Sequence, residues 1–441
     1  MTRTRLRAAS LGLLLLLVSL SSGVARAENW PQWRGPNGDG VSRETDTPIA
    51  WSESKSIVWK CELPPWGCST PAVWGDAVFL TSHVENRDLL LLKIDKQTGK
   101  IVWQRTVDTV ATDRMPAGKA MAPHRGVQKF HLDHNLASPS PVTDGKLVIV
   151  HFGNGVLAAY DFAGNVLWLR NLQEDHGPYT IWWGHANSPV LHDNLVISVC
   201  MQDSCTNLDG PPSPSYVVAH DKQTGGQVWK AMRMTSATAE SCDSYATPIL
   251  RRSGDRVELV VMGGLVLDAY DPANGKRLWY LPGLIGNRTI TGPVVAEDMI
   301  FVTQGMRQPL LAVKPGGPGE RTHRDVAWKV EQGTPDSPTP VGWGEWLYLV
   351  TNDGIARCIN IRNGRQGWKE RLKGDYRASP LAVEGRIYFL NTKGLCTVVS
   401  ASSRFDRLTE NQLDDQTLAS PAVSDGKLFI RGRKTLYCIR K

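Results

Sequence analysis

Short apolar runs separated by turn residues recur along the chain from residue 51 to residue 441. Residues 137–168 show the pattern: ASPSPV is followed by an Asp-Gly turn, the run KLVIV, the run VLAAYD, a second turn and NVLW. Apolar and β-branched runs of this length, bounded by Gly, Pro, Asn and Asp, are typical of short antiparallel strands, and Asx-Gly turns permit the positive φ of tight hairpins. No sustained 3.6-residue apolar period occurs here. The pattern predicts units of four short strands rather than long helices.

Two signatures mark the units. The phrase DKQTGKIVW at Asp95–Trp103 returns as DKQTGGQVW at Asp221–Trp229, with weaker copies at 160–168, 270–279 and 359–368. Upstream of the phrase, a Ser, Thr or Gly precedes a Pro and a short apolar run, and the last two intervals between these prolines are 42 and 41 residues. Four antiparallel strands repeated every ~40 residues are typical of a β-propeller blade. The eight prolines are Pro71, Pro139, Pro189, Pro248, Pro293, Pro338, Pro380 and Pro421.

The eighth unit lacks its fourth strand. It ends with Thr435–Arg440, whereas Ser56–Leu63, ahead of the first full unit, has the pattern of an isolated fourth strand. Pairing the two removes two exposed sheet edges. We therefore predict an all-β fold, an eight-bladed β-propeller of four-stranded antiparallel blades whose ring is closed by an N-terminal strand that completes the last blade. The tryptophans expected to dock one blade on the next, each burying about 150–250 Å², are Trp59, Trp103, Trp168, Trp229, Trp279, Trp328 and Trp368.

The Ser-Pro inner strands and the Asp-x-x-Thr-Gly-x-x-x-Trp phrase together resemble the tryptophan-docking repeats of the pyrroloquinoline quinone (PQQ)-like propeller superfamily, over residues 51–441. The prefix NWPQWRGPNGDG at Asn29–Gly40 resembles the start of a group of exported, BamB-like proteins. The resemblance implies eight four-stranded blades. It leaves the activity open, because the superfamily contains both quinoprotein dehydrogenases and non-enzymatic members such as the BamB-like lipoproteins of outer-membrane assembly.

The N-terminus has the features of a cleavable secretory signal: three arginines, the apolar run Leu11–Leu20 and Ala-Arg-Ala at 25–27. The run is shorter than the roughly 20 residues of a spanning helix, and no cysteine follows it directly. We expect a periplasmic or secreted protein with no stable membrane anchor, divided into a signal peptide (1–27), an extension (28–50) and one propeller domain (51–441). Losing residues 1–27 removes four arginines and lowers the formal charge from +7 to +3, so nucleic acid is not an expected partner.

Eight cysteines occur in a chain expected to reach an oxidising compartment, and some disulfides are therefore expected. The sequence leaves their pairing open. Cys200–Cys205 is the first candidate pair, whereas Cys358 and Cys438 have the pattern of small buried apolar residues in strands.

Polar, ionisable and aromatic residues gather where the inner strands begin and in the loops after the second strands. In blades of this topology both positions lie on one face, and ligands are commonly held at such a channel mouth. Ordinary solvated loops carry similar residues, so this alternative stays open. Mixed charge there favours a polar or anionic ligand. The candidate residues are His134, Asn135, Trp183, His185, Asn187, Gln202, Asp203, Asp243, Tyr245, Arg288, Asp336 and Arg377.

No catalytic residue can be assigned from the sequence. The resemblance implies enzymes that hold PQQ beneath a disulfide of adjacent cysteines and bind calcium through Glu, Asn and Asp, but no two cysteines are adjacent here and no Cys-x-x-Cys-His occurs. The histidines of the long insertions form no i, i+4 pair, so no metal site is predicted; they are His124, His131, His134, His176 and His185.

These observations favour a non-catalytic, exported scaffold that binds a cell-envelope protein or a small polar ligand. The alternative is a PQQ-dependent oxidoreductase, using PQQ with calcium, or a degenerate relative of one.

Overall fold

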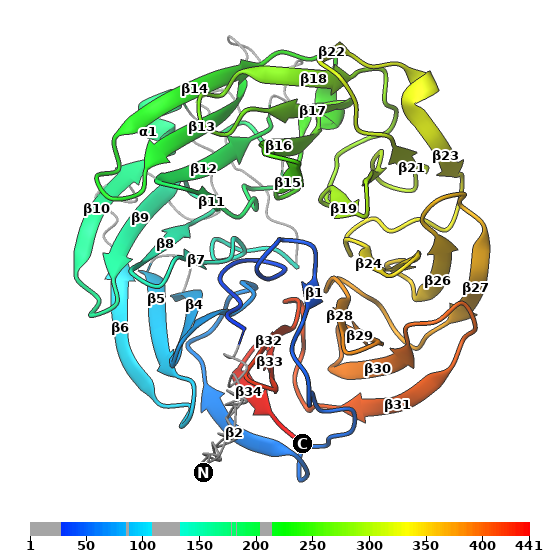
Figure 1. The fold of residues 1–441 in the computed structure, drawn as a ribbon. Helices are drawn as coiled ribbons and strands as arrows, with labels where there is room; N and C mark the ends of the chain where they lie inside the picture. Colours follow the sequence, from blue (N-terminus) through cyan, green and yellow to red (C-terminus); the bar gives the residue numbers. More distant parts are fainter. Residues whose placement is uncertain (1–27, 85–87, 108–132, 178, 182, 203–213) are drawn as a thin grey trace, which may run out of the picture.

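The structure is a computed structural model that describes residues 28–84, 88–107, 133–177, 179–181, 183–202 and 214–441. Within these ranges the chain is almost entirely β, with one short α-helix, α1 (Leu172–His176), and two 3₁₀ turns at Ala239–Cys242 and His323–Asp325. No helix in the described ranges has the length and apolar character needed to span a membrane. The strands form eight sheets around a common centre (Figure 1), which confirms the eight-bladed propeller.

The blades follow one another in chain order, each from an innermost first strand to an outermost fourth strand (Figure 1). Blade 1 contains β3 (Ala72–Trp74), β4 (Ala77–Val84), β5 (Asp88–Asp95) and β6 (Ile101–Val107), and blade 2 contains β7 (Val142–Thr143), β8 (Leu147–His151), β9 (Val156–Asp161) and β10 (Val166–Asn171). Blade 3 contains β11 (Val190–His192), β12 (Leu195–Cys200), β13 (Ser215–Asp221) and β14 (Gln227–Arg233), and blade 4 contains β15 (Ile249–Ser253), β16 (Arg256–Gly263), β17 (Val266–Tyr270) and β18 (Arg277–Leu281). Blade 5 contains β19 (Val294–Ala296), β20 (Met299–Thr303), β21 (Leu310–Val313) and β23 (Val326–Val330), and blade 6 contains β24 (Val341–Trp343), β25 (Trp346–Val350), β26 (Ile355–Asn360) and β27 (Gln366–Arg371). Blade 7 contains β28 (Leu381–Val383), β29 (Arg386–Leu390), β30 (Leu395–Ser400) and β31 (Arg407–Gln412), and blade 8 contains β32 (Ala422–Ser424), β33 (Lys427–Arg431), β34 (Thr435–Ile439) and β2 (Ile57–Glu62).

Two-sided burial explains the continuous apolar runs of the middle strands. Both faces of a blade pack on neighbouring blades, so β8 is buried at every position and β9 at all but the last. A strand buried on both faces has no solvent side on which to place polar residues. Two further short strands, β22 (Gly319–Glu320) and β1 (Val41–Ser42), add in parallel to β18 and β28.

The ring closes as the sequence predicts. β2 pairs antiparallel with β34, with Cys61 opposite Leu436 and Glu62 opposite Thr435. In Figure 1 the blue β2 lies beside the red β34 at the junction between the last blade and the first. The strand thereby covers the edge that β34 would otherwise expose.

The repeated tryptophan joins each blade to the turn of the next. The indole N–H of Trp168 in blade 2 donates to the Lys222 carbonyl of blade 3 at 2.9 Å, and the ring lies on Gly225 of the same turn. Gly225 has φ +71°, and a Cβ placed there would lie 2.6 Å from the ring. The turn glycine therefore permits both the hairpin and the close approach of the tryptophan.

Six of the seven predicted tryptophans make this bond between blades: Trp59, Trp103, Trp168, Trp229, Trp328 and Trp368 donate to the carbonyls of Lys96, Phe162, Lys222, Pro272, Ile361 and Ser402. Trp279 departs from the pattern. Its indole donates to Glu258 within blade 4 at 3.2 Å, and its ring is fully buried.

Hydrogen bonds also link the starts of the inner strands. The Thr70 N–H donates to the Ser140 hydroxyl oxygen at 2.9 Å, and Ser140 and Ser188 donate in the same way to the next hydroxyl along the ring. We call the hydroxyls that take part the hydroxyl ring. This bond explains why Ser or Thr precedes the proline. The remaining members are Thr247, Thr339, Ser379 and Ser420, with Gly292 supplying only an N–H.

These bonds correct two of the eight prolines assigned from the sequence. In ASPSPV and DSPTPV the hydroxyl of the ring precedes the second proline, Pro141 or Pro340, so Pro139 and Pro338 lie outside the equivalent position. The inner strands accordingly start after the second proline, at residues 142 and 341.

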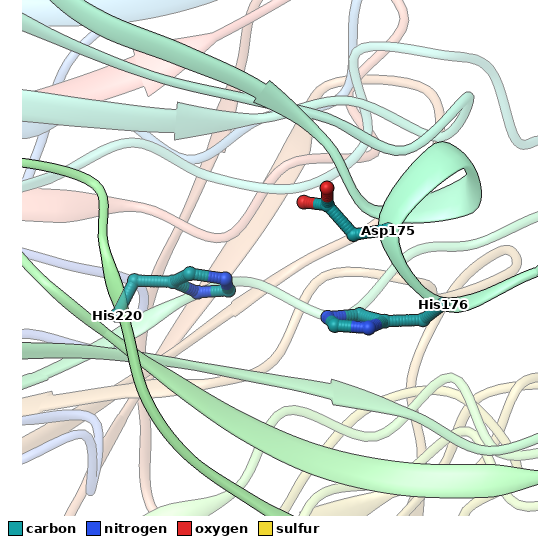
Figure 2. Close-up of side chains that lie close together, drawn as sticks. All are labelled: Asp175, His176 and His220. Atoms are coloured by element: carbon teal, nitrogen blue, oxygen red, sulfur yellow. The ribbon is translucent and has the colours of Figure 1, made fainter.

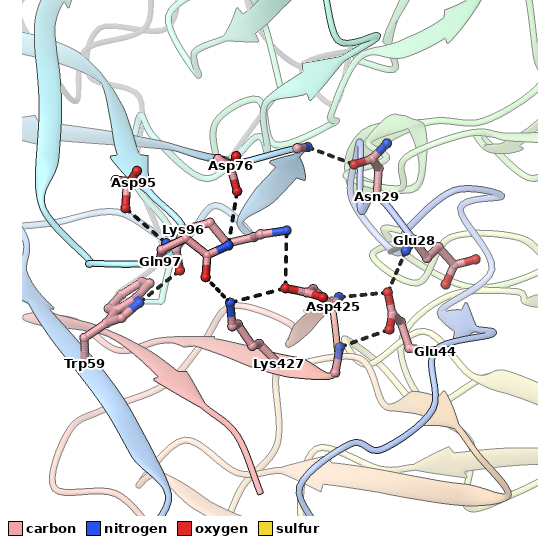
Figure 3. A network of polar contacts seen from close by, with 12 residues as sticks. Glu28, Asn29, Glu44, Trp59, Asp76, Asp95, Lys96, Gln97, Asp425 and Lys427 are labelled. Carbon is pink, nitrogen blue, oxygen red and sulfur yellow. Dashed lines mark hydrogen bonds and ion pairs between the residues drawn. The ribbon is translucent and has the colours of Figure 1, made fainter. Parts of the chain in front are cut away.

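The N-terminal residues 28–47 lie across the inner strands on the side of the first hairpin turns. Trp30 exchanges backbone hydrogen bonds with Val73 of blade 1, and Ala382 of blade 7 donates to the Gly40 carbonyl. Figure 3 shows Glu44 accepting the N–H groups of Asp425 and Gly426 in blade 8, at 2.8 and 3.0 Å. The segment thus contacts blades on both sides of the ring closure.

No disulfide joins any two of the seven cysteines in the part of the chain that the structure describes. Cys358 and Cys438 are fully buried in strands, as predicted. Cys205 lies outside the described residues, so the pair Cys200–Cys205 stays a prediction.

Candidate functional site

A cavity of about 300 Å³ lies at the centre of the ring, where the inner strands begin. Trp33 of the N-terminal segment contributes to its lining, and Arg34 fixes that segment. The Arg34 guanidinium is buried and donates to the Thr339 carbonyl at 2.7 Å and the Pro340 carbonyl at 2.5 Å. The lining residues are Trp33, Cys68, Thr70, Asp133, His134, Ser138, Ser140, Trp183, Ala186, Ser188, Tyr245, Thr247, Arg288, Ile290, Asp336, Ser337, Asn352, Arg377, Ser379, Leu418, Ala419 and Ser420.

The hydroxyl ring forms much of the inner wall. Five of its members line the cavity, and each hydroxyl oxygen there accepts an N–H from the neighbouring blade. A hydroxyl that accepts such a bond still carries its own O–H donor. The wall therefore offers hydrogen-bond donors from several blades to an acceptor-rich ligand.

Glu240 organises one side of the rim. Its Oε1 accepts the Trp183 indole N–H at 2.8 Å and an Arg288 N–H at 3.2 Å, and its Oε2 accepts the Asn287 amide at 2.8 Å. The Tyr245 hydroxyl accepts the Trp183 backbone N–H at 3.2 Å, and burial holds the pKa of this phenol well above its usual value. One carboxylate thus fixes an aromatic ring and a guanidinium at the rim.

An ion pair lies on the other side of the cavity. The Arg377 Nε donates to Asp133 Oδ2 at 2.9 Å, and both side chains are about one-third exposed. His134 Nδ1 lies 2.7 Å from the Ser138 hydroxyl. Because Arg288 pairs with Glu240 and Arg377 with Asp133, neither guanidinium is left without a carboxylate. The geometry favours polar ligands of low net charge over strongly anionic ones.

The structure brings together half of the residues predicted for the channel mouth. His134, Trp183, Tyr245, Arg288, Asp336 and Arg377 line the cavity. Asn135, His185, Asn187, Gln202 and Asp243 are buried behind it. Asp203, and with it His124 and His131 of the insertions, lies outside the described residues.

His185 illustrates why sequence position misleads here. Its Nε2 lies 2.9 Å from the Val199 carbonyl, and its ring stacks on Tyr179 at 5.1 Å, inside the packing of blades 2 and 3. Burial lowers the pKa of His185 to about 4, so the ring is neutral at physiological pH. The residue supports the wall from behind.

Three kinds of lining or rim group escape sequence reasoning. Glu240 lies in a 3₁₀ turn that carries no repeat signature, and Trp33 lies in a prefix with no strand pattern. The hydroxyls before the prolines are visible in every repeat, yet the sequence shows only their recurrence. Their position on the inner wall follows from bonds between blades.

Comparison with known families shows to which family the chain belongs. A family model described as "Outer membrane protein assembly factor BamB" matches residues 40–209 and 213–441. The chain belongs to the BamB family. This confirms the resemblance drawn from the repeats, and no curated protein matches this BamB-family chain by sequence.

Solved structures share the fold of this BamB-family chain at low identity. BamB from Moraxella catarrhalis matches with a TM-score of 0.56 and 13% identity, covering 87% of this chain and 99% of that one. Quinohemoprotein alcohol dehydrogenase from Comamonas testosteroni matches with a TM-score of 0.67 and 12% identity, covering 93% and 80%. A europium-containing methanol dehydrogenase matches with a TM-score of 0.62 and 12% identity, covering 92% and 90%. At these identities the matches show the fold alone.

The cavity residues do not fit the calcium-bound PQQ that the superfamily resemblance implies. Cys68 is the single thiol of the described lining, and burial raises its pKa to about 11. The Asn352 amide accepts from the Ser337 N–H and donates to the Ser337 hydroxyl, both at 2.9 Å. The Asp133 carboxylate is held by Arg377. The Asn352 amide oxygen and the Asp133 carboxylate, two oxygen donors of the kind that calcium needs, are therefore engaged by protein groups.

Proposed function

We propose that the chain is an exported, non-catalytic propeller of the cell envelope that takes a polar segment of a partner protein into the mouth of its central cavity. The proposal rests on one observation: a cavity of about 300 Å³ that combines hydroxyl donors, two aromatic indoles and charge-balanced arginines. Membership of the BamB family supports a scaffold rather than an enzyme.

The size and polarity of the cavity favour insertion of a short segment. A volume near 300 Å³ lies at the lower end of ligand sites, which suits one or two side chains with their backbone amides. Peptide amides offer both donors and acceptors without net charge, and the wall and rim offer complementary groups. The aromatic rings of Trp33 and Trp183 supply flat apolar surface beside them.

Site-specific photo-crosslinking tests this function. Tyr245 is replaced by p-benzoylphenylalanine, which keeps an aromatic ring at the cavity, and the protein is irradiated in cells of its native host. We expect a discrete adduct to a cell-envelope protein. The matched control places the same group at Arg362, an exposed residue of a turn on the opposite face, with 68% of its side chain accessible. Adducts at residue 362 with none at residue 245 would show that the wrong face was chosen.

The alternative, a PQQ-dependent oxidoreductase, is favoured by the quinoprotein structures that share the fold over more than 90% of this chain. Titrating the purified protein with PQQ in the presence of Ca²⁺, while following tryptophan fluorescence, separates the two functions. The scaffold predicts no saturable quenching. Saturable PQQ binding, accompanied by reduction of a dye in the presence of an alcohol substrate, would contradict the scaffold function and support the oxidoreductase.

A further inference from the structure

Three potential metal ligands meet at the junction of blades 2 and 3, away from the central cavity. Asp175 and His176 end α1, directly after the last strand of blade 2, and His220 lies on β13 of blade 3. One ligand atom from each residue lies within 4.8 Å of the others. Figure 2 shows the two imidazoles approaching each other from opposite sides, with the carboxylate beside the gap.

Three of the four imidazole nitrogens in this cluster are buried without a hydrogen-bond partner among the described residues. His220 is fully buried, and neither its Nδ1 nor its Nε2 has a hydrogen-bond partner among the described residues. The same holds for Nε2 of His176. Buried polar atoms of native proteins are nearly always satisfied, so a cluster of unpaired imidazole nitrogens points to a missing ligand.

Two cationic side chains lie beside the cluster, and one of them holds its carboxylate. Arg170 Nε donates to Asp175 Oδ2 at 2.8 Å and holds the carboxylate in place. Outer-shell bonds of this kind orient metal ligands. Lys230, whose ammonium lies 4.7 Å from the Tyr216 ring centroid, is the other cation facing the cluster.

We propose that Asp175, His176 and His220 bind a divalent first-row transition-metal ion and so join blade 2 to blade 3. Two imidazoles and a carboxylate suit Zn²⁺ and its neighbours rather than the oxygen-preferring Ca²⁺ or Mg²⁺. Ligand bonds of about 2.0–2.2 Å require the side chains to close by about 1 Å, and three protein ligands leave a position for water. This proposal replaces the sequence-based expectation of no metal site.

The sequence could not show this cluster. His176 and His220 are 44 residues apart, and no spacing motif connects them. They meet because a one-turn helix brings the end of blade 2 against a strand of blade 3.

Metal titration of the purified, tag-free chain tests the proposal. After treatment with EDTA, Zn²⁺ is titrated by calorimetry and Co²⁺ by visible absorption, with Ca²⁺ as the negative control. We expect one equivalent of Zn²⁺ to bind, a Co²⁺ d–d spectrum from mixed nitrogen and oxygen ligands, and a rise of the melting temperature with Zn²⁺ only. Absence of Zn²⁺ binding by the unmodified protein up to 1 mM, roughly a thousandfold above a micromolar Kd, would overturn the proposal.

Three substitutions assign the site. His176→Ala and Asp175→Asn change residues near the surface and should each weaken Zn²⁺ binding at least tenfold, and His220→Asn should do the same if its melting temperature shows a folded protein. The matched control is His192→Ala, because His192 lies 3.5 Å from Asp193 in a pair that lacks a second imidazole. Zn²⁺ binding that survives both His176→Ala and Asp175→Asn would place the ion elsewhere and refute the assignment.

Discussion

The contact between Trp168 and Gly225 allows the docking of one blade on the next to be measured by a double-mutant cycle. Trp168→Ala removes a ring that is 8% exposed, together with its bond to the Lys222 carbonyl. Truncation of a buried aromatic costs about 3–5 kcal/mol of unfolding free energy. Gly225→Ala adds a Cβ that lies 2.6 Å from the same ring, at φ +71°.

The cost of Gly225→Ala has two parts. The left-handed backbone costs about 1–2 kcal/mol for an L-residue, and overpacking against the indole costs about 1–3 kcal/mol more. Once Trp168 is replaced by alanine, the second part disappears. The substitution should then cost only about 1–2 kcal/mol, which gives a coupling of about 1–3 kcal/mol between the two sites.

Gly254→Ala is the matched control. Gly254 has φ +58° in a hairpin turn, but nothing lies within 4 Å of an added Cβ. Its cost should be the same with and without Trp168. The assay is urea unfolding followed by far-ultraviolet circular dichroism, because tryptophan fluorescence changes with the substitution itself. Equal costs of Gly225→Ala in both backgrounds would show that the ring does not press on the turn.

Three further predictions concern pH, the ring closure and the rim. The pKa values of buried His83 and His185 are lowered to about 4, so the unfolded chain takes up protons before the folded one as the pH falls. The free energy of unfolding should therefore decrease between about pH 6.5 and pH 4, by up to about 1.4 kcal/mol per pH unit for each histidine. His185→Gln should reduce the pH dependence of the unfolding free energy across this range, and an unchanged slope would contradict the assignment. Deleting residues 28–63 removes β2 and exposes the edge of β34, so size-exclusion chromatography should show aggregates. A stable monomer would mean that another segment covers this edge. Glu240→Gln weakens the bonds that hold Trp183 and Arg288, and the crosslink at residue 245 should fall severalfold at a nearly unchanged melting temperature; a full yield would show that the rim needs no such support.

The fold could be predicted because its signals are local. Each turn, each Pro-led strand and each terminal tryptophan lies within about 40 residues and repeats, so a single error does not hide the architecture. The closing strand was recognisable for the same reason, since Ser56–Leu63 carries the pattern of a fourth strand without the other three. The choice between Pro139 and Pro141 failed because both follow a serine, and only a bond from blade 1 distinguishes them.

The cavity was less predictable because it forms from residues far apart in sequence. His134 and Tyr245 could be placed near the mouth from their position before the inner strand, and both line it. The same rule also selected His185, which turns back into the packing between blades. Strand register tells where a residue lies along the chain, but in the irregular segment before the strand it does not tell which way the side chain points.

The N-terminal segment links ring closure to the cavity. Arg34 carries its charge into the interior, where burial lowers its pKa to about 10, and carbonyl oxygens of blade 6 accept its N–H groups. Leaving these donors unpaired inside the protein would cost more than the bonds themselves contribute, so the segment is held against the ring and Trp33 stays at the cavity. A ligand then enters from the face that carries Trp183 and Tyr245. Binding measured on a chain that lacks residues 28–50 would therefore report on a different cavity.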